Sequence, residues 1–148
     1  MSPGAMPTSE VLDRALVRQP EILAALTAVH EAAWASVDTT LLALCEARVA
    51  TLLGYELAQA PPRLPAELLA ALPGWPTAPQ LSAAQRACLA FTEQFIIDVA
   101  SIDDDTVAAV FDALGPDGLV SFTNALLVIE QRQRMHLMWS RLLPEVLS

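Results

Sequence analysis

The sequence predicts an all-α protein, on three observations. Apolar residues recur at spacings of three and four along most of the 148-residue chain. No run of β-branched residues alternates with polar ones between turn signals. Capping residues and prolines stand where the apolar runs begin and end. We expect about six or seven helices in one domain, residues 9–148, after a flexible tail, residues 1–8, since this length suffices for one core.

The first third of the chain carries clear helix start and stop signals. Three helices are expected there, at about residues 10–18, 20–35 and 39–53. Ser9 can cap the first, and Pro20 opens the second at a position where proline needs no amide donor. Asp38 can cap the third helix, and Gly54 fits its C-terminal end.

The rest of the chain is divided by prolines, glycines and acidic residues. Four helices are expected, at about residues 66–72, 83–100, from 101 or 103 to 114, and 117–143. The segment Gly74-Trp75-Pro76 should break the chain after the first of these. Ser82 can cap the next, Pro116 opens the last, and Pro144 ends it.

The charge balance excludes some partners. Seventeen acidic residues face eight basic ones, all arginine, for a net charge of -9. Such a surface repels phosphate, so we expect no nucleic-acid partner. It also repels anionic membrane surfaces. The N-terminal residues lack the pattern of a signal peptide, and the longest uncharged apolar stretch, residues 118–129, is too short for a bilayer. A cytoplasmic location follows as an expectation.

The apolar content is unusually high for one small domain. Hydrophobic residues make up 54% of the chain, and the mean hydropathy is +0.43. Two of the expected helices are apolar on most faces, as shown by Phe91, Phe95, Ile96, Ile97 and Val99 in one and Leu126 to Ile129 in the other. Helices of this kind are buried, and here burial should include contacts between subunits. We therefore predict an obligate homo-oligomer.

Two segments together resemble the carboxymuconolactone decarboxylase and AhpD-like family. The first, VDTTLLALCEARVATLLGYELA (Val37 to Ala58), has the family's internal Arg-Val-Ala and a glycine, Gly54, before the reactive loop. The second, LSAAQRACLAFTEQF (Leu81 to Phe95), precedes an acidic helix and a long last helix that carries Arg134. The resemblance covers roughly residues 35–143, and residues 59–80 match poorly. It implies an AhpD-like helical fold assembled as a trimer or hexamer.

The redox members of this family use a glutamate, a Cys-x-x-Cys pair and a histidine. The matching positions here hold Ala43, Tyr55, Ala58 and, near the histidine position, Pro62. Cys45 and Cys88 are 43 residues apart on different expected helices and should be two reduced, buried thiols. A dithiol site needs close cysteines and a lowered thiolate pKa. We therefore expect no alkylhydroperoxidase activity.

The decarboxylase branch works without a redox pair, and its chemistry needs a cation for the substrate carboxylate and an acid or base. The pool for these roles is Tyr55, Glu56, Glu93, Arg134 and His136. Tyr55 and Glu56 stand at the reactive-loop position and can donate and accept a proton. Their structural alternatives are a packed ring and a solvated carboxylate. Glu93 lies in an apolar helix, where burial raises a carboxyl pKa. Its alternative is an ion pair, at a subunit interface, or a surface position.

Arg134 can clamp a substrate carboxylate, or it can form an ordinary helical salt bridge with Glu130 four residues earlier. His136 is the natural general base if it lines a pocket, and otherwise a structural histidine. His30 should be a packed helix residue, and Arg48 should tie its helix to a neighbour.

Two functions remain open. The first is a cofactor-free, non-redox enzyme, of lyase or isomerase type, acting on a small carboxylated or lactone-like molecule. The second is a non-catalytic family member that binds a small molecule or serves as a scaffold. No metal-ligand spacing or phosphate-binding glycine loop is present, so we expect no metal and no cofactor. Convergence of Glu93, Arg134 and either Tyr55 or His136 on one enclosed cavity favours the enzyme; separate ion pairs favour the second hypothesis.

Overall fold

A computed structural model describes residues 8–54 and 64–146, and these residues form helices without any strand. Six α-helices and two short 3-10 helices make up this described part: α1 (Thr8–Ala15), α2 (Pro20–Ser36), α3 (Thr39–Leu52), α4 (Ala66–Ala71), η1 (Leu72–Thr77), α5 (Ala83–Ile97), η2 (Val99–Ser101) and α6 (Asp104–Val146). The prediction of an all-α protein is confirmed.

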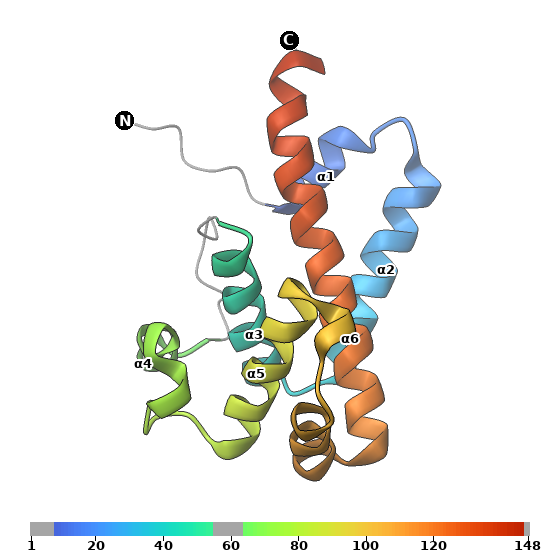
Figure 1. The fold of residues 1–148 in the computed structure, drawn as a ribbon. Coiled ribbons are helices and arrows are strands. Elements are labelled where there is room, and N and C mark those ends of the chain that lie inside the picture. The colour runs from blue at the N-terminus through green and yellow to red at the C-terminus, as the bar shows by residue number, and fades with distance from the viewer. Residues whose placement is uncertain (1–7, 55–63, 147–148) are drawn as a thin grey trace.

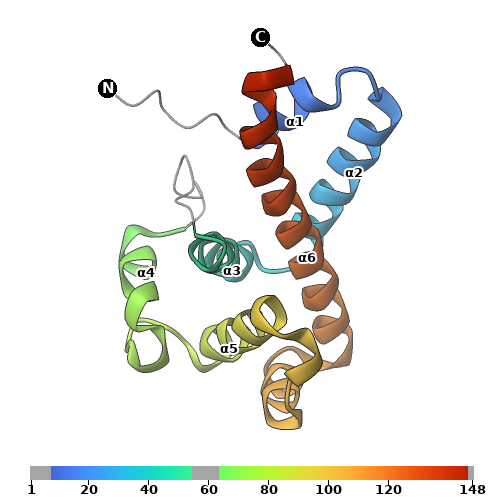
Figure 2. The ribbon, with the colours of Figure 1, turned by 45° about the horizontal axis from the view of Figure 1, so that its top comes forward.

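The long helix α6 organises the molecule. Helices α1 and α2 pack against α6 on one side, and α3 and α5 pack against it and against each other on the other side (Figure 1). Helix α4 and η1 lie at the edge remote from α2 and reach the rest through α3 and α5 (Figure 2). Helix α3 therefore lies between α6 and the edge formed by α4 and η1.

Helix α3 is the centre of the core. Leu42, Leu44 and Val49 on this helix have no exposed surface. Phe122 of α6 is equally buried, and its ring meets Phe91 of α5 edge-on, with 5.8 Å between ring centroids. A helix with apolar residues on nearly every face needs neighbours all round, which is the place that α3 occupies.

The expected caps of the two central helices are confirmed. The side chain of Asp38 accepts a hydrogen bond from the backbone N–H of Leu41 at 2.9 Å, at the start of α3. Ser82 and Gln85 form a reciprocal capping box at the start of α5. These bonds satisfy amide donors that have no partner within the helix.

Several predicted boundaries are wrong. Helix α1 begins at Thr8, so Ser9 lies inside it and does not cap it, and α1 ends at Ala15 and not at residue 18. Residues 1–7 of the expected tail lie outside the described part. Helix α5 stops at Ile97, because the extended backbone of Asp98 separates it from η2.

Prolines and glycines interrupt the helices at most of the expected places. The expected break at residues 74–76 is present in part, because α4 ends at Ala71 and Gly74 leaves helical geometry, although the 3-10 helix η1 spans these residues. Pro144 does not end α6, which continues to Val146. The expected division at Gly115 is present as a sharp bend inside α6, with φ +73° and ψ 177° at that glycine. Positive φ suits glycine, which has no Cβ to clash with the backbone.

Candidate functional site

The described members of the predicted catalytic set do not share one ion pair or cavity. Tyr55 and Glu56 lie outside the described residues. Glu93, Arg134 and His136 are described, and each has different surroundings. The first two belong to separate ion pairs, which is the arrangement that favours the non-catalytic hypothesis.

Glu93 joins three elements of the fold. Its Oε1 atom accepts hydrogen bonds from Arg48 Nε at 2.8 Å, Arg48 Nη2 at 2.5 Å and Trp75 Nε1 at 2.8 Å. Arg48 comes from α3 and Trp75 from η1, so the expectation that Arg48 ties its helix to a neighbour is confirmed. Three donors already occupy this oxygen, so Glu93 serves as a structural link between α5, α3 and η1.

The other two residues lie on α6. Arg134 Nε donates to Glu130 Oε1 at 2.6 Å, and about half of the Arg134 side chain is exposed. This is the ordinary helical salt bridge that the spacing suggested. His136 is buried, and burial lowers its pKa, so the neutral imidazole is favoured.

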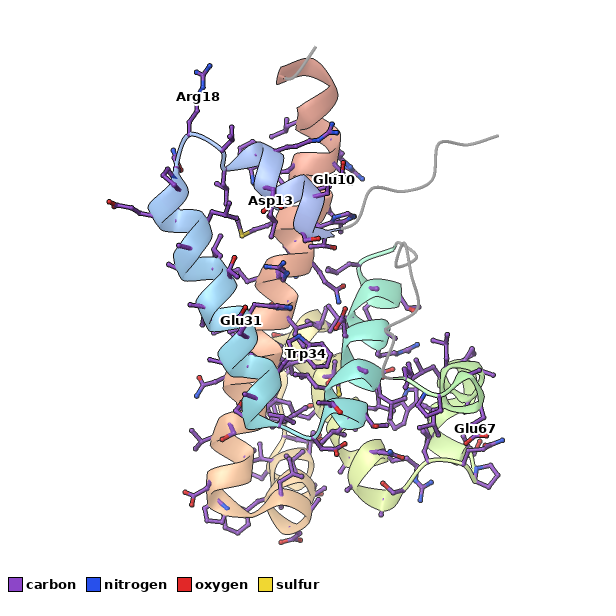
Figure 3. The ribbon with its side chains drawn as sticks, turned by 180° about the vertical axis from the view of Figure 1, so that it is seen from behind. Glu10, Asp13, Arg18, Glu31, Trp34 and Glu67 are labelled. Atoms are coloured by element: carbon purple, nitrogen blue, oxygen red, sulfur yellow. The ribbon has the colours of Figure 1, made fainter. Side chains whose placement is uncertain are left out.

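A different set of titratable residues, drawn from four helices, interacts electrostatically through Arg132. Asp13 lies on α1, His30 on α2, Glu46 on α3 and Arg132 on α6. The charge of Arg132 lowers the pKa values of His30 and Glu46, and the charges of Glu46 and Asp13 raise the pKa of Arg132. Figure 3 shows this side of the molecule, with Asp13 labelled on α1 and Trp34 on α2. We call these four residues the Arg132 cluster.

Burial shifts the pKa values of the Arg132 cluster. Desolvation raises the pKa of Glu46 from 4.5 to about 7, against the opposing attraction of Arg132. Desolvation also lowers the pKa of His30 to about 4, and the positive charge of Arg132 lowers it further. The pKa of Arg132 itself is lowered by burial, while Glu46 and Asp13 oppose this change. A carboxyl with a pKa near 7 is able to give or take a proton at neutral pH.

A small cavity opens beside this cluster. Its volume is about 10 Å³, which is room for one water-sized group. The lining residues are Leu12, Leu26, Val29, His30, Val128, Gln131, Arg132 and Met135. The Nδ1 atom of His30 is buried and has no hydrogen-bond partner among the described residues. The wall of the cavity therefore contains one cation, one imidazole and one amide side chain among mostly apolar residues.

A hydrogen bond also joins α3 and α6 close to Glu46 and Arg132. Gln133 Nε2 donates to the backbone carbonyl oxygen of Glu46 at 2.8 Å. This bond joins α6 to α3 one residue away from Arg132. The position of Glu46 relative to Arg132 is thus set by the main chain as well as by charge.

Sequence reasoning missed Glu46 and Arg132. One signal was present, because Glu46 and Arg48 are the sole charged residues within the apolar stretch 41–53. A charge in such a helix needs a partner from another helix. Arg132 gave no comparable signal, since it lies in the polar run Gln131-Arg132-Gln133-Arg134, which reads as a solvated surface.

The two thiols are closer than their sequence separation suggested. Cys45 on α3 and Cys88 on α5 have no exposed surface, and neither forms a disulfide. Burial raises the pKa of Cys45 to about 12, and burial together with the nearby Cys45 raises the pKa of Cys88. The separation of 43 residues was therefore the wrong reason to dismiss the pair. Burial and the protonated state are what make these thiols poor nucleophiles.

Within 8–54 and 64–146, no three or more histidine, cysteine or carboxylate side chains are placed to hold a metal ion. No helix in the same ranges has both the length and the apolar content needed to cross a membrane. Comparison of the chain with protein-family profiles, characterised proteins and solved structures finds no match.

Proposed function

We propose that this chain is a homo-oligomeric, thiol-independent protein of the carboxymuconolactone decarboxylase and AhpD-like type that binds a small carboxylated molecule at the Arg132 cluster without turning it over. The observation that carries this proposal is the half-buried Arg132 guanidinium beside a cavity with mostly apolar walls. Arginine is the side chain best suited to hold a carboxylate in such a setting.

The rest of the described chain supports binding over catalysis. Glu93 and Arg134 are occupied in separate ion pairs, and both thiols are buried and protonated. The cavity is far smaller than the several hundred Å³ that typically enclose an organic substrate. One carboxylate oxygen fits inside it, and the remainder of the ligand would lie along the seam between α2 and α6.

The test is a thermal-shift screen with small carboxylates and lactone acids, combined with native mass spectrometry. A ligand present at a hundred times its Kd stabilises the folded state by about 3 kcal/mol, which raises Tm by roughly 5–10 °C in a protein of this size. We expect this shift in the wild type and in Arg134→Gln, and its loss in Arg132→Gln. The Arg134 variant is the matched control, because it removes an arginine two residues away outside the cavity.

Three results would contradict the proposal or part of it. Equal loss of the shift in both variants would mean that the ligand does not use the Arg132 cluster. Absence of any shift in the wild type, with no retained mass in native spectra, would remove ligand binding altogether. A monomer in the same spectra would contradict the homo-oligomer and the family assignment.

Acid–base catalysis at the same cluster is a second candidate, favoured by one observation. The pKa of about 7 at Glu46 places a carboxyl in both protonation states at neutral pH beside Arg132. A cofactor-free lyase or isomerase needs this combination. Substrate loss followed by NMR tests it: Glu46→Gln should keep binding and abolish turnover. Binding without turnover in the wild type would contradict catalysis and support the first candidate.

A further inference from the structure

Arg132 differs from the other partly buried arginines in its contacts. The described part of the chain has three arginines of this kind, Arg48, Arg86 and Arg132. Arg48 is bonded to the Glu93 carboxylate, and Arg86 donates to two backbone carbonyl oxygens. Within residues 8–54 and 64–146, Arg132 forms neither a hydrogen bond nor a direct ion pair, and it lines the cavity. A partly desolvated guanidinium with unused donors is suited to an anion.

Glu46 approaches Arg132 from another side than the cavity does. Glu46 lies on α3, whereas the walls of the cavity come from α1, α2 and α6. The charges of Glu46 and Arg132 act on each other although the two side chains form no direct ion pair. A ligand carboxylate in the cavity and the carboxylate of Glu46 would therefore share one guanidinium. Two carboxylates at one site repel each other, which favours the protonated form of one of them.

Glu46 is the carboxyl that takes the proton. Gln133 Nε2 donates to the backbone carbonyl oxygen of Glu46 at 2.8 Å, so the main chain at Glu46 is held close to α6 and does not withdraw from the ligand. Burial has already raised the pKa of Glu46 from 4.5 to about 7. A small carboxylate in water keeps a pKa near 4, so it stays ionised at neutral pH. The repulsion is thus relieved by protonation of Glu46.

The other titratable groups around Glu46 contribute little between pH 6 and pH 8. The carboxylates and arginines of the helices packed around it are paired or exposed: the pairs Arg48–Glu93 and Glu130–Arg134, and the exposed residues Asp13, Glu31 and Glu67. Water and salt screen the exposed charges. On α2, His30 has a pKa of about 4 and is neutral in this range. On α6, burial lowers the pKa of His136, which also favours its neutral form.

We propose that binding of a carboxylate ligand at Arg132 is coupled to the uptake of one proton by Glu46, so that the protein holds the ligand at low pH and releases it as the pH rises. This inference rests on the proposed function and adds its regulation. Ionised Glu46 competes for Arg132 from within the protein, and protonated Glu46 leaves the guanidinium to the ligand. The proton comes from the solvent and returns to it on release.

The expected size of the effect follows from the fraction of protein that is ready to bind. With a pKa of about 7, the protonated fraction of Glu46 falls from about 90% at pH 6 to about 10% at pH 8. The apparent Kd varies inversely with this fraction, so it should rise about tenfold between the two pH values.

The first experiment titrates the protein with sodium acetate at pH 6, 7 and 8 at constant ionic strength. The Kd is measured from the backbone amide NMR signals of Val128 and Gln131, which line the cavity. Saturable binding should be present at pH 6 and weaken about tenfold by pH 8 in the wild type. Arg132→Gln should abolish it at every pH.

Two further variants identify the group that takes the proton. Glu46→Gln should bind acetate with one Kd at all three pH values, close to that of the wild type at pH 6. Glu31→Gln is the matched control, because Glu31 is an exposed carboxylate on α2, one residue from His30 (Figure 3). It should keep the tenfold change. A tenfold change that persists in Glu46→Gln overturns the inference.

The second experiment needs no variant, because it follows the carboxyl carbon signal of Glu46 by NMR as the pH of the wild type changes. Acetate at ten times its Kd at pH 6 should move the midpoint of this titration up by about one pH unit. A midpoint that stays in place overturns the inference.

The two proposals fail in different ways. A wild-type Kd for acetate that is the same at pH 6 and pH 8, with binding lost in Arg132→Gln, overturns the proton coupling and leaves the proposed function standing. A wild type that shows no saturable acetate binding at pH 6 contradicts both.

Discussion

Replacing Glu46 with glutamine should change how the stability of this protein depends on pH. The carboxyl of Glu46 has a folded-state pKa of about 7 and an ordinary value of 4.5, because burial disfavours its charged form. Between these two values the folded state binds more protons than the unfolded state. Stability is therefore full below pH 4.5 and falls as the pH rises through 7. Glutamine occupies the same space and has no proton to lose.

The magnitude follows from the same two values. The difference between 4.5 and about 7 corresponds to about 3 kcal/mol in the free energy of unfolding. Glu46→Gln and the wild type should respond alike near pH 4, where both side chains are neutral. By pH 8 the variant should have gained about 3 kcal/mol relative to the wild type.

The assay is urea denaturation followed by far-UV circular dichroism, at half-unit steps from pH 4 to pH 8. Glu67→Gln is the control, because Glu67 is an exposed residue of α4 on the outer edge of the molecule (Figure 3). Its curve should run parallel to that of the wild type. Parallel curves for Glu46→Gln as well would refute the reasoning, since Glu46 would then titrate as it does in the unfolded chain.

Three further predictions test the cluster, the core and the η1 contact. Burial lowers the folded-state pKa of His30 to about 4, so its contribution to stability is present above pH 6.5 and lost as the pH falls toward 4. Since His30 is only partly buried, His30→Gln should reduce this acid loss by only about 1 kcal/mol in the same urea assay, and an unchanged loss of stability at acid pH would contradict this prediction. Phe122→Ala should cost about 3–5 kcal/mol, because Phe122 is fully buried against Phe91; a loss below 1 kcal/mol in urea would mean that the core collapses to fill the space. Trp75→Phe removes the hydrogen bond to the Glu93 carboxylate and should lower the free energy of unfolding by about 2 kcal/mol. Amide hydrogen exchange should become faster in η1 alone, and equally faster exchange throughout the protein would contradict a local role.

Much of the fold was predictable because local signals agreed with the packing. The caps at Asp38 and Ser82 mark helix starts that the structure also has. The errors lie where a neighbouring helix changes the local outcome. Asp98 adopts an extended backbone and its side chain caps η2, which ends α5 earlier than the apolar pattern suggested. Gly74 leaves helical geometry, yet the turn continues through Trp75, whose indole N–H is held by Glu93.

The candidate site was less predictable, because its residues come from four helices. Spacing along one helix correctly gave the pair between Glu130 and Arg134. It gave nothing for Glu46 and Arg132, since their sequence separation carries no trace of the packing of α3 on α6. The same limit applies to Cys45 and Cys88, which the packing of α3 on α5 brings near each other.

Helix α3 carries two charged residues in its apolar stretch, Glu46 and Arg48. One of them forms a complete ion pair, and the other belongs to the candidate functional site. Glu46 and Arg48 are two residues apart, so they point about 160° away from each other on the helix. Each is matched by an opposite charge from a different neighbour, Arg132 on α6 or Glu93 on α5. Arg48 and Glu93 form a direct ion pair that needs no further group. Glu46 keeps a pKa near 7 despite Arg132, so it is partly protonated at neutral pH. Its neutral form leaves the charge of Arg132 open to a carboxylated ligand, and its exchangeable proton suits acid–base chemistry.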